Sequence, residues 1–301
     1  MKLILLLIVV ILLSACSFFS SSVKNFKPLQ TDHLPMPDMA LNIANFGSCS
    51  NSKDRTFNIN SNYPITIFVH GRNGSAGNFR DLAQLYADYG QQSVCFSYPQ
   101  RESLSLSADK LAFSLQQLIK TTHNKNIAVL GHSLGGLIAR KALETHKKED
   151  LVSRGINIKL ITIATPFAGI EAASPCTSHL LNWMSLGVIP SICWGIVGDS
   201  WSEITTTSDF IKHPKPLLPV VHHHLNIITN EINTCRNKNA IGECIVSDYI
   251  FELSEQHNVL IDRFSSVKNI QVNAGHVEII GYKQHLPFKL LAILQREHML
   301  F

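Results

Sequence analysis

The residues best suited to chemistry are Gly131-His132-Ser133-Leu134-Gly135, which fit the pattern G-x-S-x-G. They follow a short apolar run and open a run with helical spacing, which is the strand–turn–helix context that this pattern needs. A serine in such a turn takes an unfavourable backbone conformation, and the flanking glycines let strand and helix approach closely. The N–H of Leu134, at the helix N-terminus, would donate to an oxyanion. The spacing therefore predicts that Ser133 is a nucleophile.

A serine hydroxyl is a weak nucleophile near neutral pH, so it needs a base, and the base needs an orienting acid. Among the 14 histidines, His276 is the best candidate base, because it follows a short apolar segment and precedes the last helical run. His222, His223 and His224 form an adjacent run. Neighbours in a strand point to opposite faces, so these three histidines predict the entry of a strand and not a metal site.

Strand-like and helix-like runs alternate along the chain. The expected strands are 65–69, 93–98, 127–130, 158–164, 225–229 and 270–272, and the expected helices are 78–89, 134–146, 287–296 and one capped by Ser107. Apolar strands that alternate with helices predict a parallel sheet buried on both faces. The expected fold class is therefore α/β, with a mostly parallel, doubly wound sheet flanked by helices.

One long stretch, 169–221, interrupts this alternation. It holds all three tryptophans and many aliphatic residues, and it is too long for an ordinary connection. It is either extra core above the sheet or an apolar, lid-like insertion that forms an acyl-chain cleft, and we favour the lid.

The N-terminus has the features of an export signal. Residues 1–15 begin with a positively charged Lys2, which is followed by an apolar run too short to span a bilayer. The sequence Leu-Ser-Ala-Cys that ends at Cys16 resembles the lipobox of bacterial lipoproteins, which implies lipidation of Cys16. Ser17 implies sorting to the outer membrane. We therefore expect a lipoprotein signal peptide over 1–15, a tether over 16–40 and one domain over 41–301. The protein would be exported and anchored at the outer membrane or cell surface. An ordinary secretory signal is the alternative.

Composition supports one globular domain and gives no sign of a nucleic-acid partner. Hydrophobic residues make up 45% of the 301 residues and charged residues 16%, which is enough for a single large core. The net charge is +4 and its lysines and arginines are scattered, so no basic patch points to nucleic acid.

The cysteines fit an oxidising compartment. Seven are present, and six remain once the candidate lipidation site is set aside, so disulfides are permitted. Cys235 and Cys244 bracket a short polar loop, and Cys176 and Cys193 bracket another segment. Cys95 lies inside an apolar run and fits a buried thiol.

Three motifs resemble bacterial lipases and related α/β-hydrolases. They are a His-Gly pair after the first apolar strand, Gly-His-Ser-Leu-Gly-Gly at 131–136 and Ala-Thr-Pro-x-x-Gly at 164–169. Together they cover 64–170, and the C-terminal part matches more weakly. The resemblance implies an α/β-hydrolase fold, with the Arg72 N–H as second oxyanion donor. His70 fits a structural residue that shapes this loop.

The resemblance also suggests the acid. The family often shows Ser-Asp-Gly-Val-Val after the fifth strand, and Ser247-Asp248-Tyr249 fits best, with tyrosine in place of glycine. Asp248 is therefore the preferred acid, in the chain order serine, acid, histidine. Glu255 and Asp262 compete with it.

These residues together predict a serine hydrolase that cleaves carboxylic esters, with lipid or acyl esters as substrates. Acyl transfer to water through an acyl-enzyme needs no metal or organic cofactor. The lipid anchor would place the enzyme at a membrane. An acyltransferase or thioesterase with the same nucleophile is one alternative, and a lipoprotein that binds a lipid or a partner without catalysis is another.

Overall fold

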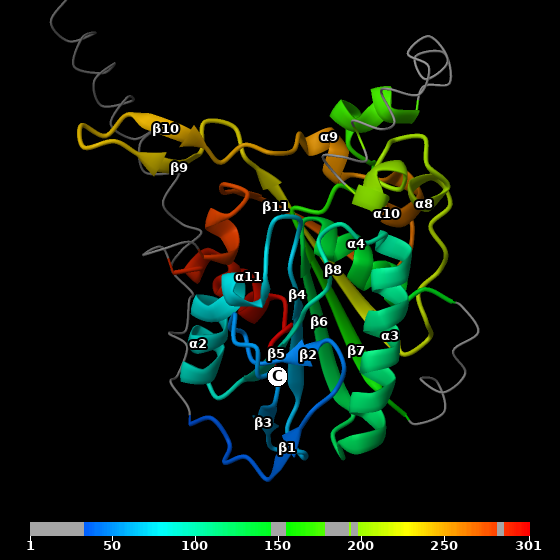
Figure 1. Ribbon diagram of the computed structural model, residues 1–301, viewed down its shortest axis with the longest axis vertical. Coiled ribbons are helices and arrows are strands. Elements are labelled where there is room, and N and C mark those ends of the chain that lie inside the picture. Colours follow the sequence, from blue (N-terminus) through cyan, green and yellow to red (C-terminus); the bar gives the residue numbers. More distant parts are fainter. Residues whose placement is uncertain (1–32, 146–154, 178–192, 194–197, 282–285) are drawn as a thin grey trace, which may run out of the picture. The chain divides into compact units, whose positions relative to one another are not determined.

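The computed structural model describes residues 33–145, 155–177, 193, 198–281 and 286–301 (Figure 1). The expected signal peptide, Cys16 and the first part of the tether lie outside this part of the chain. Within it, none of the helices combines the length and the apolar character that crossing a bilayer requires.

A seven-stranded sheet forms the centre of the domain. Its strands are β2 (Phe46–Gly47), β4 (Ile65–Val69), β5 (Gln92–Phe96), β6 (Asn126–His132), β7 (Asn157–Ile163), β8 (Val221–Asn230) and β11 (Val267–Asn273). They lie in the order β11-β8-β7-β6-β4-β5-β2. Every neighbouring pair is parallel except β2 and β5. The predicted mostly parallel α/β sheet is confirmed.

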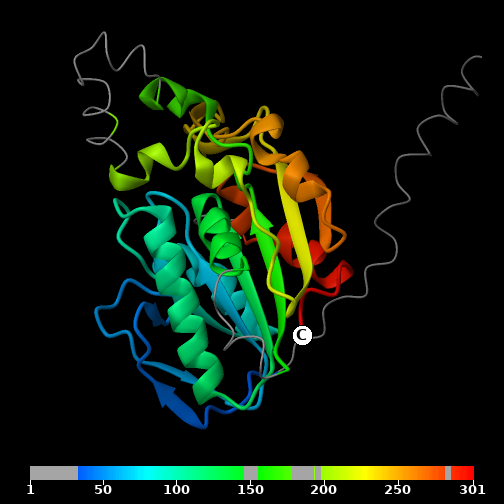
Figure 2. The same cartoon turned by 90° about the vertical axis from the view of Figure 1, so that its right-hand side faces the viewer.

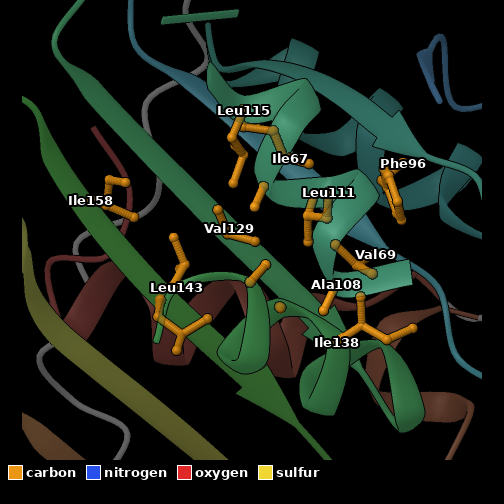
Figure 3. Packing of buried hydrophobic residues seen from close by; sticks show 14 of the residues in the cluster. Ile67, Val69, Phe96, Ala108, Leu111, Leu115, Val129, Ile138, Leu143 and Ile158 are labelled. Atoms are coloured by element: carbon orange, nitrogen blue, oxygen red, sulfur yellow. The ribbon is translucent and has the colours of Figure 1, made fainter. Parts of the chain in front are cut away.

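Helices cover both faces of this sheet, as its apolar strands require. Helices α3 (Leu104–Thr121) and α4 (Leu134–Ala142) lie on one face, and α2 (Arg80–Asp88) and α11 (Phe288–Arg296) on the other (Figures 1 and 2). The odd-numbered side chains of β4 pack with those of α3 and α4 (Figure 3). On the opposite face the ring of Phe68 stacks on Phe79 with centroids 5.1 Å apart. Burial on both sides explains why β4 is apolar at nearly every position.

Two helix boundaries differ from the prediction by more than one or two residues. Helix α3 begins at Leu104 because Ser103, and not Ser107, is its N-cap: the Ser103 hydroxyl accepts a hydrogen bond from Leu106 N at 3.2 Å. Ser107 is buried inside the helix and donates to Glu102 Oε2 at 2.7 Å. Serines alternate with leucines here, so the sequence offers several equivalent caps. Helix α4 ends at Ala142, before the predicted 146.

Short elements that periodicity does not reveal surround the sheet. They are β1 (Met39–Leu41), β3 (Phe57–Ile59), η1 (Ala76–Phe79), η2 (Glu171–Thr177), η3 (Gly198–Ser202), α8 (Asp209–Lys212), β9 (Cys235–Lys238), β10 (Cys244–Ser247), α9 (Leu253–Gln256), α10 (Val259–Asp262) and η4 (Glu278–Ile280). Strands β9 and β10 form an antiparallel hairpin that stands apart from the main sheet (Figure 1). Of the expected lid-like insertion 169–221, only parts are described, so its role as a lid stays a prediction.

Disulfides hold the hairpin and the edge of the sheet. Cys235 is bonded to Cys244, which confirms that this pair closes a short loop. The interpretation of Cys95 as a buried thiol is wrong, because Cys95 in β5 is bonded to Cys49. Cys193 is disulfide-bonded as well, and the side chain of Cys176 lies outside what the structure describes.

Candidate active site

The predicted chemical residues meet at one edge of the sheet. Ser133 follows β6, Arg72 lies in the loop after β4, and His276 lies in the loop after β11. Because the carboxyl ends of parallel strands lie along the same edge, these loops converge. They line one cavity of about 540 Å³, together with Leu134 and Gly71.

Ser133 occupies the strained turn that the sequence predicts. Its backbone has φ 57° and ψ −129°, a conformation that non-glycine residues rarely adopt and that costs about 1–3 kcal/mol. Its N–H donates to the carbonyl of Ile163 at 2.8 Å, which fixes the turn against the neighbouring strand. The surrounding sheet therefore holds the serine above its edge.

The glycines around Ser133 are required by close backbone approach. A Cβ added at Gly131 would lie 2.6 Å from the carbonyl carbon of Gly135, and one at Gly135 would lie 2.8 Å from that of Val69. A Cβ at Gly71 would lie 2.7 Å from the Cβ of Ser133. Real Cβ atoms essentially never come so close. Any side chain at these positions would displace Ser133 or the loop that faces it.

The loop after β4 is shaped by His70, as predicted. The His70 ring is buried and stacks on Tyr98, with centroids 4.3 Å apart and planes 5° apart. The Tyr98 hydroxyl donates to the carbonyl of His70 at 2.7 Å. Burial lowers the pKa of His70 below its usual 6.5, with a smaller contribution from the positive charge of Arg55. The neutral ring thus serves packing, and the loop presents Gly71 and Arg72 to the cavity.

His276 is buried and its ring is held by a carboxylate. Its Nδ1 lies 2.8 Å from Oε1 of Glu231, and the ring of Phe251 packs against it nearly at right angles. A carboxylate at Nδ1 accepts the ring proton there and leaves Nε2 available as a base. The carboxylate that orients this ring is therefore Glu231.

Glu231 comes directly after β8 and is 1% exposed. Besides the imidazole, it accepts hydrogen bonds from Ile250 N at 2.5 Å, Phe251 N at 3.0 Å and the Thr229 hydroxyl at 2.8 Å. A buried carboxylate tolerates its charge only when such donors satisfy it. Glu231 is thus held rigidly in the geometry that orients His276.

The prediction that Asp248 orients the base is wrong in this structure. Asp248 Oδ1 accepts from Arg236 Nε and Nη2 at 2.9 and 2.8 Å, and Oδ2 accepts from the N–H groups of Val277 and Glu278 at 3.0 Å. Its carbonyl accepts from His276 N at 2.9 Å. Asp248 therefore holds the backbone of the His276 loop, and its carboxylate is fully used in doing so.

Neither alternative acid contacts the base. Glu255 accepts from Glu171 N at 2.9 Å, and Asp262 lies 3.3 Å from His257. The sequence held a positional signal for Glu231, although no motif. Glu231 lies two residues after the predicted strand 225–229 and stands between serine and histidine in the chain. The match of Ser247-Asp248 to the family motif led to the choice of Asp248 in place of Glu231.

His132 links the turn at Ser133 to the loop that carries His276. Its Nε2 donates to the carbonyl of His276 at 2.8 Å, and the two rings lie 4.7 Å apart. Burial, above all, holds the pKa of His132 well below 6.5, and His276 and Arg236 lower it further. His132 is therefore neutral at physiological pH and acts here as a hydrogen-bond donor.

The histidine run at 222–224 enters β8, as predicted. His224 is buried, and its Nε2 lies 2.9 Å from the Thr162 hydroxyl. Burial, with a smaller effect from Arg140, lowers its pKa to about 3. Among the described residues, no group of three or more histidine, cysteine, aspartate or glutamate side chains is arranged to hold a metal ion.

The sequence matches a known protein family. The family model described as "Putative serine esterase (DUF676)" matches residues 60–239, which include Ser133 and Glu231. No curated protein is similar enough to count as a match.

Solved structures share the fold at low sequence identity. The mature form of the Bacillus licheniformis lipase BlEst2 is 17% identical, with a TM-score of 0.53 over 87% of this chain and 99% of that chain. Its propeptide form is 18% identical, with a TM-score of 0.52 over 86% of this chain and 54% of that chain. The family match spans more than half of this chain, so the protein belongs to the DUF676 family and is a serine hydrolase of the α/β-hydrolase type.

Proposed function

We propose that the protein hydrolyses carboxylic esters through Ser133, His276 and Glu231. The observation that carries this proposal is the buried pair of Glu231 Oε1 and His276 Nδ1, 2.8 Å apart. His276 lines the same cavity as the strained Ser133. A carboxylate, an imidazole and a serine in this order form the arrangement that activates a hydroxyl.

The chemistry follows from the positions of these groups. His276 Nε2 takes the proton of Ser133 Oγ as the oxygen attacks the ester carbonyl, and Glu231 stabilises the imidazolium that forms. The N–H groups of Leu134 and Arg72 donate to the oxyanion. His276 then protonates the departing alcohol, which leaves an acyl-serine. Water, deprotonated by the same imidazole, releases the carboxylic acid and restores the serine.

The position of Leu134 agrees with this mechanism. Leu134 is the first residue of α4, where backbone N–H groups have no partner within the helix. No hydrogen bond joins Ser133 Oγ to His276 in the described part of the chain, and such bonds commonly tighten only with substrate bound.

We propose lipid or acyl esters as the substrate class. Apolar side chains line much of the cavity beside the nucleophile: Phe79, Ile170, Ile250, Phe251, Val277 and Ile280. An acyl chain would gain about 25 cal/mol for each Å² of apolar surface that it buries there. The expected lipid anchor at Cys16 would bring the site to a membrane, and the disulfides at Cys49–Cys95 and Cys235–Cys244 suit an exported protein.

Labelling by a fluorophosphonate probe tests the proposed function directly. The unmodified protein should label, and Ser133→Ala should not. Glu231→Gln and His276→Ala should label far more slowly, because the hydroxyl loses its base. A series of p-nitrophenyl esters of rising chain length then measures how the cavity accepts acyl chains. A folded, unmodified protein that neither labels nor cleaves any of these esters would rule the proposal out.

Anchoring is tested separately. Metabolic labelling of the full chain with a radioactive fatty acid should mark the wild type and spare Cys16→Ser. Fractionation should then move Cys16→Ser from the membrane to the soluble fraction. A wild type without label would favour the ordinary secretory signal.

A further inference from the structure

The charged groups that line the cavity are all positive. Arg72 and Arg236 belong to its described lining, and no aspartate or glutamate does. The two nearby carboxylates, of Glu231 and Asp248, are each 1% exposed and directed to their own donors. A substrate in this cavity therefore meets cations and apolar side chains.

Arg236 is held in place with part of its guanidinium uncommitted. Its Nε and Nη2 donate to Asp248 Oδ1 at 2.9 and 2.8 Å. Nη1 makes no hydrogen bond to any described residue, although a guanidinium carries five N–H donors. The side chain remains 26% exposed. The arginine is thus oriented by one carboxylate and retains donors for another acceptor.

Asp248 contacts the backbone of the His276 loop as well as Arg236. The same carboxylate also accepts hydrogen bonds from the N–H groups of Val277 and Glu278. Arg236 also lies close enough to the residue before Ser133 that its positive charge is one of the smaller causes of the lowered pKa of His132, after burial and His276. His132 directly precedes the nucleophile.

The hairpin that carries Arg236 is closed by a disulfide. Cys235, the residue before Arg236, is bonded to Cys244 across β9 and β10. A planar guanidinium on such a fixed element loses little conformational entropy when it binds a carboxylate or phosphate. This arrangement suits recognition of an anion.

We propose that Arg236 is a specificity-determining residue that binds an anionic group, a carboxylate or a phosphate, carried by the ester substrate. The inference rests on the proposed ester hydrolysis at Ser133. The apolar part of the substrate would lie against Ile170 and Ile250, and the anion would reach Arg236, with Arg72 adding positive charge across the cavity.

A pair of esters of matched shape tests this inference. The mono-4-nitrophenyl ester of adipic acid carries a terminal carboxylate, and 4-nitrophenyl 6-methylheptanoate carries an isopropyl group of similar shape in its place. The ratio of their kcat/KM values measures recognition of the anion. We expect the wild type to favour the adipate ester and Arg236→Gln to reduce the ratio about 10- to 100-fold, as loss of a charge-assisted hydrogen bond would.

Two further variants separate charge from geometry. Lys238→Gln removes the same charge from the same hairpin, but Lys238 does not line this cavity, so the ratio should stay unchanged. Arg236→Lys should keep part of the preference, because an ammonium supplies charge without the planar fork. Equal losses on both esters in Arg236→Gln would show that Arg236 only positions the His276 loop through Asp248, and would overturn the inference.

Short-chain lipids distinguish the two sources of the anion. Release of hexanoate from dihexanoyl phosphatidic acid is compared with release from dihexanoylglycerol in the same variants. If Arg236 affects the preference only within the phosphatidic acid and diacylglycerol pair, the anion that it binds is a phosphate head group. If Arg236 affects the preference only within the adipate pair, the anion is a carboxylate on the acyl chain. No dependence for either pair overturns the inference.

Binding without turnover separates failure of the inference from failure of the proposed function. Ser133→Ala removes the nucleophile and leaves Arg236 in place. Calorimetry with monomethyl adipate and methyl 6-methylheptanoate should show tighter binding of the anion to Ser133→Ala than to the double variant with Arg236→Gln. If the wild type hydrolyses no ester but this difference persists, the anion site stands and the hydrolase proposal falls. Equal binding of both compounds would overturn the anion site.

Discussion

The turn that carries Ser133 and the segment that carries the proposed acid and base, Glu231 and His276, are built in different ways. The turn is local: six consecutive residues, 131–136, supply the serine and its glycines where β6 ends and α4 begins. The acid–base segment draws on the end of β8, the β9–β10 hairpin and the loop after β11. Spacing along the chain encodes the first region. The second depends on which of two carboxylates reaches an imidazole, and that is decided by packing.

The largest expected effect is in the local region. Ser133→Ala removes the attacking oxygen, so kcat should fall by about 10⁶-fold, as in other enzymes with an activated serine. Steady-state kinetics with a p-nitrophenyl ester measures the loss, and Ser254→Ala, at an exposed serine, is the matched control. Residual activity within tenfold of the wild type would place the nucleophile elsewhere.

The next effect decides between the two carboxylates. Glu231→Gln should lower kcat by about 10⁴-fold, because an amide at Nδ1 favours the wrong tautomer of the base. Asp248→Asn should cost about 10- to 100-fold, since Asp248 contacts the backbone of the His276 loop and not the ring. Both variants have nearly the volume of the original side chain, and thermal unfolding should show that each is folded. The reverse ranking would restore Asp248 as the orienting acid.

The sequence predicts the first region well because its signals are short-range. Each parallel strand from β4 to β7 has a buried apolar stretch. Glycine is required at 131 because β6 closely approaches the start of α4, and at 135 because α4 closely approaches the end of β4. The left-handed backbone at Ser133 follows from the same pattern. Local spacing therefore contains nearly all of the information that this region uses.

The second region is harder to predict because long-range contacts decide it. Asp248 fits the family motif, yet Val277, Glu278 and Arg236 use its oxygens. Glu231 shows no motif, and it becomes the partner of His276 only when β8 and β11 lie side by side. The bond from Cys95 to Cys49 is hidden for the same reason. The sequence around Asp248, Glu231 and Cys95 does not indicate which distant residue each of them contacts.

Two of the disulfides, Cys49–Cys95 and Cys235–Cys244, can be compared by their effects on stability and activity. Loss of Cys49–Cys95, which spans 46 residues, should lower the unfolding free energy by about 4 kcal/mol, and loss of Cys235–Cys244, which spans 9, by about 2.7 kcal/mol. The double variants Cys49→Ser/Cys95→Ser and Cys235→Ser/Cys244→Ser are compared by denaturant unfolding and by kcat/KM. The hairpin variant should lose more activity relative to its loss of stability, because Arg236 and Asp248 depend on the hairpin. Equal activity losses would argue against that coupling.

The smallest expected effect is on the pH dependence of stability and compares the two ends of β8. Glu231 follows the strand at the proposed catalytic site, and His224 is buried in the core near the start of the strand. The pKa of His224 is about 3 in the folded protein and about 6.5 in an unfolded chain. The unfolded state therefore binds more protons as the pH falls below 6.5, and stability decreases from there toward pH 3. Between pH 8 and pH 5.5 this histidine should cost about 1.4 kcal/mol.

His224→Gln removes that contribution and can still donate toward the hydroxyl of Thr162, which His224 contacts at 2.9 Å. Denaturant unfolding at several pH values should therefore show a shallower loss of stability in the variant than in the wild type. His222→Gln, at an exposed position on the same strand, should keep the wild-type slope. The pH profile of ester cleavage should be unchanged in both variants, because neither side chain lines the cavity. An altered pH profile of activity in His224→Gln would show that the environment of His224, near the start of β8, affects the proposed catalytic residues at its end. The two ends of the strand would then not have separate roles.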